Sequence, residues 1–261
     1  MMKKKRTPSL SEIEVSIDEF KPGTELEAVK GFKLGVYGNG GSGKTYLTLA
    51  TGRKTLLIDT EGNARTIIQQ FPKEIRENVL IKEIKTSNDD GDIDFPLACD
   101  RFEAAVKTAC KFATEHPEDD YLIVIDSISE YWEWLSIWLT MQTDLARSQS
   151  GKMIQTEWGR PNKRHANILA MLKNTECDII LIGKAHPVFG DGGKMLDVND
   201  PKWQKGIPFW ADICGELSFD GVDTKFKITK NRFGRFYDVI SDADYVKIKE
   251  HITEKSGVKF D

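Results

Sequence analysis

A glycine-rich stretch, Gly38-Asn39-Gly40-Gly41-Ser42-Gly43-Lys44-Thr45, follows the short apolar run at 34–37. It matches the pattern G-x-x-x-x-G-K-T, whose glycines let the backbone wrap around phosphates and turn its N–H groups inward. The helix expected after it points its positive end at the same phosphates. The stretch therefore predicts a Walker A phosphate loop that binds a nucleoside triphosphate, ATP. Lys44 is expected to reach the β- and γ-phosphates, Thr45 to ligate Mg²⁺, and the next residue, Tyr46, to belong to the nucleotide site.

The same letters allow a second interpretation. Gly38, Gly40 and Gly43 also spell G-x-G-x-x-G, the dinucleotide fingerprint, and Asp59 lies sixteen residues beyond Gly43, near the position of a ribose-binding acid. That interpretation gives Lys44 no function, so the pattern favours the triphosphate loop. A glycine-rich turn without a ligand is the third alternative.

Composition narrows the class of protein. With 261 residues, the chain is long enough for one large α/β domain, and 39% hydrophobic with 30% charged residues is typical of a globular protein. No apolar run approaches the roughly 20 residues that cross a bilayer. The basic start at 1–6 leads into polar residues, so it predicts no secretory signal. The four cysteines form no C-x-x-C pair, which predicts reduced thiols in a cytoplasmic protein without a zinc site.

The formal net charge of −4 bears on nucleic-acid binding. A protein that binds DNA over its whole surface is usually basic. Any contact with nucleic acid must therefore come from a local basic patch.

Short apolar runs alternate with segments of helical periodicity from residue 31 onward. The runs predict strands covered on both faces, at 33–37, 54–59, 79–84, 121–126 and 178–183. The segments between them predict helices at 43–52, 63–70, 96–115, 129–146 and 160–174. Two or three further strands are expected, at 213–219, 224–230 and 235–240, with a hairpin turn at 220–221 and a last helix near 242–252.

This alternation predicts an α/β fold with a mostly parallel, twisted sheet, helices on both faces and antiparallel strands near the C-terminus. Residues 186–210 are rich in Gly, Pro and Asp, which predicts a long loop. Residues 1–30 are charged and lack periodicity, so they predict an N-terminal arm or peripheral element. Residues 31–261 then form the core domain.

Two carboxylates are candidates for the chemistry. Asp126 ends the apolar strand at 121–126, as a Walker B aspartate that holds Mg²⁺ beside Thr45 would. Ser127 follows it, so the water-activating glutamate that many ATPases carry at that position must come from elsewhere. Glu61 emerges at the end of the next strand after the phosphate loop and is the candidate general base. The alternative for 59–61 is a helix cap.

These motifs together resemble the RecA/RadA recombinase superfamily. The resemblance covers 31–240 and is carried by the phosphate loop, Asp-x-Glu at 59–61, Ile-Val-Ile-Asp-Ser at 123–127 and Lys-Asn-Arg-Phe-Gly at 230–234. It implies a RecA-type P-loop NTPase core with Glu61 as the catalytic glutamate. It also implies that Lys230 and Arg232 reach a neighbour's γ-phosphate across a subunit interface, within a homo-oligomeric ring or filament.

The compact RecA-like ATPases of bacteriophages are similar to this chain. That similarity implies a DNA-stimulated ATPase that acts on single-stranded DNA in recombination or annealing, in the bacterial host cytoplasm, with an annealing or single-strand-binding protein as partner. A nucleotide-switched loader with little turnover and a small-molecule kinase are the alternatives. Lys184-Ala185-His186-Pro187 replaces the glutamine sensor of RecA. His186 is expected either to contact the γ-phosphate or to cap its strand.

The resemblance also implies two DNA-contacting loops, at 147–164 and 187–208. Both contain basic residues, and Trp203 in the second is a candidate for stacking on a base. The basic residues are Arg147, Lys152, Arg160, Lys163, Arg164, Lys194, Lys202 and Lys205.

Overall fold

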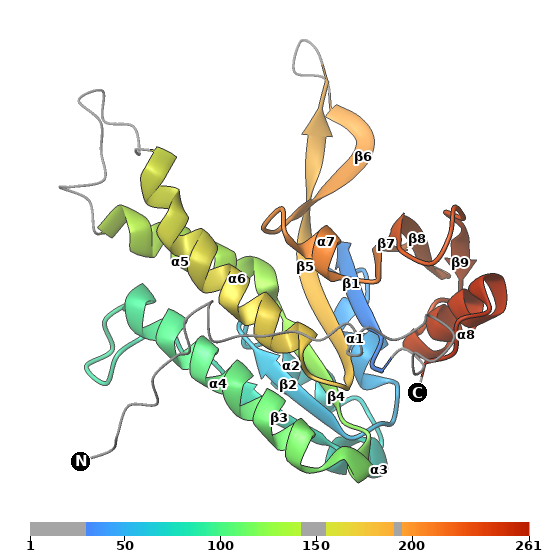
Figure 1. The fold of residues 1–261 in the computed structure, drawn as a ribbon, viewed down its shortest axis with the longest axis horizontal. Helices are drawn as coiled ribbons and strands as arrows, with labels where there is room; N and C mark the ends of the chain where they lie inside the picture. The colour runs from blue at the N-terminus through green and yellow to red at the C-terminus, as the bar shows by residue number, and fades with distance from the viewer. Residues whose placement is uncertain (1–29, 142–154, 191–194, 261) are drawn as a thin grey trace, which may run out of the picture.

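The computed structural model describes residues 30–141, 155–190 and 195–260, which fold around one nine-stranded sheet (Figure 1). The strands are β1 (Lys33–Gly38), β2 (Thr55–Asp59), β3 (Val79–Glu83), β4 (Leu122–Asp126), β5 (Asp178–Phe189), β6 (Met195–Lys202), β7 (Ile213–Phe219), β8 (Thr224–Asn231) and β9 (Val239–Ser241). The α-helices are α1 (Lys44–Leu49), α2 (Ala64–Ile68), α3 (Lys73–Glu77), α4 (Phe95–Glu115), α5 (Ile128–Met141), α6 (Gly159–Lys173), α7 (Ile207–Trp210) and α8 (Tyr245–Ser256). Two short 3₁₀ helices are η4 (Pro117–Asp119) and η5 (Gln155–Trp158).

The strand order is β3-β2-β4-β5-β1-β7-β8-β9, with β6 paired to β5 outside this path. The ladders from β3 to β7 are parallel, whereas β8, β9 and β6 join by antiparallel pairing. The predicted fold class is therefore confirmed. Because β1 lies between β5 and β7, the glycine-rich stretch leaves the middle of the sheet, where open α/β sheets bind ligands.

Two apolar layers cover the two faces of the sheet. Alternate residues of the central strands, such as Ile123 and Val124, belong to different clusters of buried side chains. One cluster includes the buried faces of α4, α5 and α6, and the other includes those of α1, α2 and α8. Successive side chains of a strand point to opposite faces of the sheet, and here both faces are buried. Every position of a central strand is therefore apolar, which explains the continuous apolar runs in the sequence.

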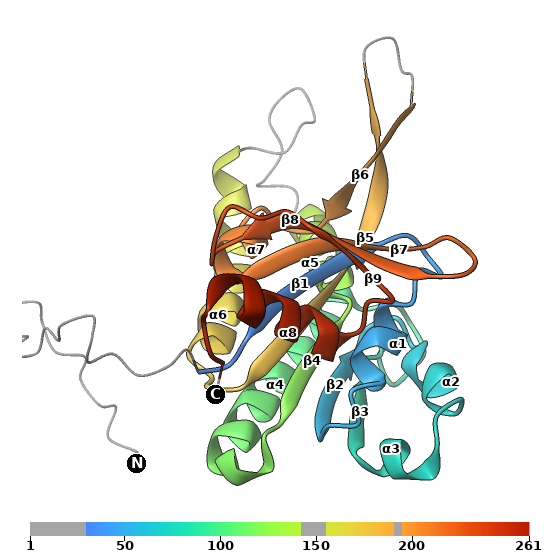
Figure 2. The same cartoon turned by 90° about the vertical axis from the view of Figure 1, so that its right-hand side faces the viewer.

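The long loop predicted at 186–210 is wrong. β5 continues beyond the parallel sheet to Phe189 and pairs with β6, so the two form a hairpin that projects from the body in both views (Figures 1 and 2). The short helix α7 follows it. The backbone ladder of β6 pairs only with β5 among the described residues. The hairpin is not covered on both faces as a central strand is, so it leaves no continuous apolar run in the sequence.

Two other predictions concern a turn, which the structure describes, and the N-terminal arm, which lies almost entirely outside the described residues. The turn at Asp220-Gly221 joins β7 to β8 as predicted, and Gly221 has a φ of +98°. The arm predicted at 1–30 lies outside the described residues apart from Lys30. None of the described helices has the length and hydropathy that a bilayer span requires.

Candidate nucleotide site

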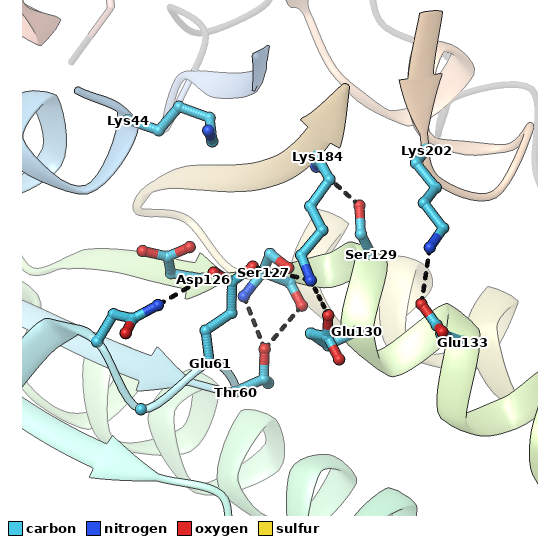
Figure 3. Close-up of polar contacts among 12 residues, drawn as sticks. Lys44, Thr60, Glu61, Asp126, Ser127, Ser129, Glu130, Glu133, Lys184 and Lys202 are labelled. Atoms are coloured by element: carbon cyan, nitrogen blue, oxygen red, sulfur yellow. Dashed lines mark hydrogen bonds and ion pairs between the residues drawn. The ribbon is translucent and has the colours of Figure 1, made fainter. Parts of the chain in front are cut away.

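The carboxyl ends of the parallel strands bring the predicted site residues to one edge of the sheet. Asp59 of β2 is the register partner of Asp126 of β4, and Gly38 of β1 is the partner of Lys184 of β5. The carboxyl ends of β1, β2 and β4 therefore lie at the same edge, and β5 crosses that edge at Lys184. Figure 3 shows Lys44, Glu61, Asp126 and Lys184 around this edge.

The loop between β1 and α1 has the shape that phosphates require. Gly41 and Gly43 have φ angles of +77° and +88°, which favour glycine. No atom lies within 4 Å of a Cβ built on either residue or on Gly40, so the loop borders open space. The ammonium of Lys44 donates to the carbonyls of Gly38 and Asn39, both at 2.8 Å. The loop thus fits a triphosphate, whose oxygens would replace carbonyls as acceptors for Lys44.

Burial lowers the pKa of Lys44, and the charges of Asp126 and Glu61 partly restore it. The lysine therefore lies within reach of the fields of both carboxylates. A cation between two anions and an incoming phosphate keeps its proton, which phosphate binding requires.

The predicted metal ligands meet directly. The hydroxyl of Thr45, on the first turn of α1, donates to Oδ2 of Asp126 at 2.6 Å. Burial raises the pKa of Asp126 to about 6, although the bond from Thr45 lowers it. A hydroxyl and a carboxylate are the oxygen donors that Mg²⁺ prefers. The pair therefore fits Mg²⁺, and a bound cation would favour the ionised form of Asp126.

The sequence allowed two interpretations of the segment 59–61, a helix cap and a catalytic base, and different residues of the segment fit each one. Asp59 is 2% exposed, and its carboxylate accepts from the backbone N–H groups of Glu61, Gly62 and Ala64 at 2.8–3.0 Å. Thr60 uses its hydroxyl on the backbone of Ser127, as donor at 3.0 Å and as acceptor at 2.7 Å. The capping is thus done by Asp59, and the side chain of Glu61 faces the site (Figure 3). Because Asp59 is buried and already accepts three backbone N–H groups, its carboxylate serves the loop rather than a ribose.

Lys184 is a site residue that the sequence interpretation did not assign. Its ammonium forms an ion pair with Glu130 of α5 and lies 3.6 Å from Oε1 of Glu61. His186 lies two residues farther along β5, exposed and opposite Asp200 in the hairpin. Its contact with a nucleotide stays a prediction. In the sequence, the end of the apolar run at 178–183 indicated that a site residue follows it. Only the register with Gly38 shows that this residue is Lys184 and not His186.

Lys230 and Arg232 lie at the other edge of the sheet. Asn231 pairs with Ile213, and Ile213 pairs with Leu34 at the start of β1. Lys230 donates to the carbonyls of Ala211 and Asp212, and Arg232 pairs with the Asp212 carboxylate at 2.6 Å. The structure therefore does not bring these two cations together with the phosphate loop of their own chain.

The residues predicted to contact DNA have mixed outcomes. The expectation for Trp203 is wrong, because its ring is 8% exposed and packs over Gly35 and Gly183 beside Tyr37. Arg164 pairs with acidic residues of α4. Arg160 and Lys202 also have acidic partners. The positions that lie outside the described residues are Arg147, Lys152 and Lys194.

The family model of the AAA domain matches residues 30–250, most of the chain. The chain belongs to this AAA domain family. Membership in this family, together with the phosphate loop, makes the chain a P-loop ATPase, which binds and hydrolyses ATP. No curated protein matches the sequence.

Two solved structures are similar to this AAA domain protein. One is a prototypical ATPase from the type III secretion system of pathogenic bacteria, with 10% identity, 72% of this chain and 51% of that chain covered, and a TM-score of 0.45. The other is EscN with its stalk EscO from enteropathogenic E. coli, with 12% identity, 72% and 42% covered, and a TM-score of 0.48. The chain spans about half of the first relative's length and less of the second.

Proposed function

We propose that this ATPase is a RecA-like, Mg²⁺-dependent motor that acts on single-stranded DNA in phage-type recombination or annealing. It works as a head-to-tail homo-oligomer, alongside an annealing or single-strand-binding protein. One observation carries the proposal. β5 places Lys184 beside the phosphate loop and then continues out of the sheet as the β5–β6 hairpin, so one strand joins the nucleotide site to a projecting arm.

The residues at the sheet edge divide the work of hydrolysis. Lys44 and the loop amides bind the phosphates, and Thr45 and Asp126, which are hydrogen-bonded to each other, would hold Mg²⁺. Bound Mg²⁺ supplies positive charge that stabilises the transferring phosphoryl group. Glu61 orients the attacking water and accepts its proton. A carboxylate held on an ordered loop beside Lys44 supports hydrolysis over transfer to a second substrate.

The position of Lys230 and Arg232 supports their action in trans. They lie level with the start of β1, four residues before Gly38, which is about 13 Å along the strand at 3.3 Å per residue. A second copy can bring them to a γ-phosphate that their own chain cannot offer. The side chain of Arg232 is 40% exposed. A cation lent by a neighbour stabilises the transition state and couples turnover to assembly.

The proposal is tested by ATPase assays with and without single-stranded DNA. A motor is stimulated by DNA, a kinase is indifferent to it, and a nucleotide switch barely turns over in either condition. Glu61→Gln should bind ATP and lose turnover, and full turnover in this variant would contradict the base assignment.

Mixed oligomers test the trans contact. Glu61→Gln and Arg232→Ala should each be inactive alone, whereas their mixture should regain activity. A neighbour with an intact Arg232 then completes a site with an intact Glu61. If the mixture stays inactive while both variants still assemble, the contribution in trans is wrong. Electron microscopy with a non-hydrolysable ATP analogue reports the assembly.

A further inference from the structure

The β5–β6 hairpin carries two lysines at directly opposite positions. Lys184 of β5 and Lys202 of β6 are register partners, so their side chains leave the same face of the hairpin. Like charges directly opposite each other on antiparallel strands repel and destabilise the pair. Such a pair requires counter-charges.

Helix α5 provides these counter-charges. Glu130 and Glu133 are three residues apart, which places them on one helix face. Glu130 forms an ion pair with Lys184, and Oε2 of Glu133 accepts from Lys202 at 2.9 Å (Figure 3). The hydroxyl of Ser129 also accepts from the backbone N–H of Lys184 at 3.0 Å. The first turns of α5 therefore fix Lys184 through its backbone and its side chain.

The ammonium of Lys184 has a second carboxylate beside it. Its Nζ lies 3.6 Å from Oε1 of Glu61, which comes from a different strand end. Burial alone would lower the pKa of Lys184, but the bond to Glu130 and the charge of Glu61 raise it above 10.5. The side chain is therefore charged, and it is shared between Glu130 and the candidate base.

We propose that Lys184 is a positioning residue for Glu61, and that Glu130 fixes the direction in which Lys184 points. The inference rests on the proposed role of Glu61 as general base. Without the lysine, Glu61 is held through its backbone by Asp59 but its carboxylate loses the fixed cation beside it. The lysine acts through Glu61, so its removal slows turnover and leaves nucleotide binding to Lys44 and the loop.

The variants Lys184→Ala, Lys184→Arg and Glu130→Gln test the inference in the full-length protein. Lys184→Ala should lower kcat about ten- to a hundredfold, the usual effect of misplacing a catalytic group, while the affinity for a fluorescent ATP analogue changes less than twofold. Lys184→Arg should recover most of kcat, since a guanidinium can bridge two carboxylates. Lys225→Ala is the matched control: it removes an equally exposed lysine paired with Asp220 in the β7–β8 hairpin and should leave both quantities unchanged.

The double variant Lys184→Ala/Glu130→Gln gives the sharpest result. Because Glu130 acts through Lys184, the double variant should be no slower than Lys184→Ala alone. Additive losses, an unchanged kcat in Lys184→Ala, or a loss confined to nucleotide affinity would each overturn the inference. Thermal melting confirms that the variants are folded.

Glu61→Gln separates this inference from the proposed function. If Glu61→Gln keeps full turnover, the base assignment fails, and the positioning role fails with it. If Glu61→Gln is inactive and Lys184→Ala is fully active, only the positioning role fails. Both roles stand when Glu61→Gln is inactive and Lys184→Ala is slowed with the affinity preserved.

Discussion

Replacing Asp59 by Asn tests whether the hydrogen bonds of the Asp59 carboxylate hold the loop that carries Glu61. The carboxylate of Asp59 accepts three backbone hydrogen bonds, through Oδ1 from Glu61 and Gly62 and through Oδ2 from Ala64. An amide can still accept from the first two, but its NH₂ group would then face the N–H of Ala64. Two donors would meet at a position that is 2% exposed.

The magnitude follows from that single lost bond. A buried hydrogen bond to a charged acceptor contributes about 1.5–3 kcal/mol, and leaving the Ala64 donor unsatisfied adds a cost of similar size. We therefore expect Asp59→Asn to lower the free energy of unfolding by about 3–6 kcal/mol, the sum of the two contributions. Since Glu61 lies two residues beyond Asp59, a shift of about 1 Å in the loop should also lower kcat up to about a hundredfold.

Urea unfolding and steady-state ATPase assays measure the two effects, and a fluorescent ATP analogue measures the affinity. The phosphate loop lies on another strand, so the affinity should change little. The control is Glu83→Gln, which removes an exposed ion pair with Arg65 and should cost less than about 1 kcal/mol. An Asp59→Asn variant with normal stability and normal turnover would show that the three bonds do not hold the loop.

Two further predictions concern the core. Asp178→Asn should lower the free energy of unfolding by about 2 kcal/mol at pH 7: burial raises the pKa of Asp178, but the bond from Tyr245 and the charge of Arg53 hold it at about 2, below its ordinary 3.8. Because the pKa of Asp178 is lower in the folded state, its ionised carboxylate stabilises the fold above pH 3.8 and loses this effect as the pH falls towards 2. In urea titrations, the difference in unfolding free energy between Asp178→Asn and the wild type should therefore vanish between pH 4 and pH 2. Trp203→Ala should cost about 3–5 kcal/mol in the same assay, because the ring fills the space over Gly35 and Gly183, and a loss below 1 kcal/mol would contradict its place in the core.

The strands of the site could be predicted because two simple regularities coincide. Continuous apolar runs marked the buried parallel strands, and the carboxyl ends of parallel strands lie at one edge. The glycine-rich loop, Asp126 and Glu61 each follow such a run directly. Their meeting at one edge therefore needed no knowledge of the strand order.

Lys184, Trp203 and the β5–β6 hairpin could not be predicted in this way. The importance of Lys184 depends on its register with Gly38 and on a helix that approaches from elsewhere in the chain. Trp203 lies in a segment rich in Gly, Pro and Asp, and its burial depends on Gly35 and Gly183, where a Cβ would lie 3.1 and 2.5 Å from the Trp203 ring. Such contacts arise from tertiary packing, which local sequence patterns do not record.

Asp59 and Asp126 show how partners decide the role of equally buried groups. They are register partners on adjacent strands and are 2% and 6% exposed. Asp59 accepts three backbone N–H groups, which use most of the acceptor sites of its carboxylate. The carboxylate of Asp126 accepts from Thr45 alone among the described residues, and burial raises its pKa to about 6. A buried carboxylate with few hydrogen-bond partners gains most from a cation, so we expect Asp126 rather than Asp59 to bind the metal, while Asp59 holds the loop.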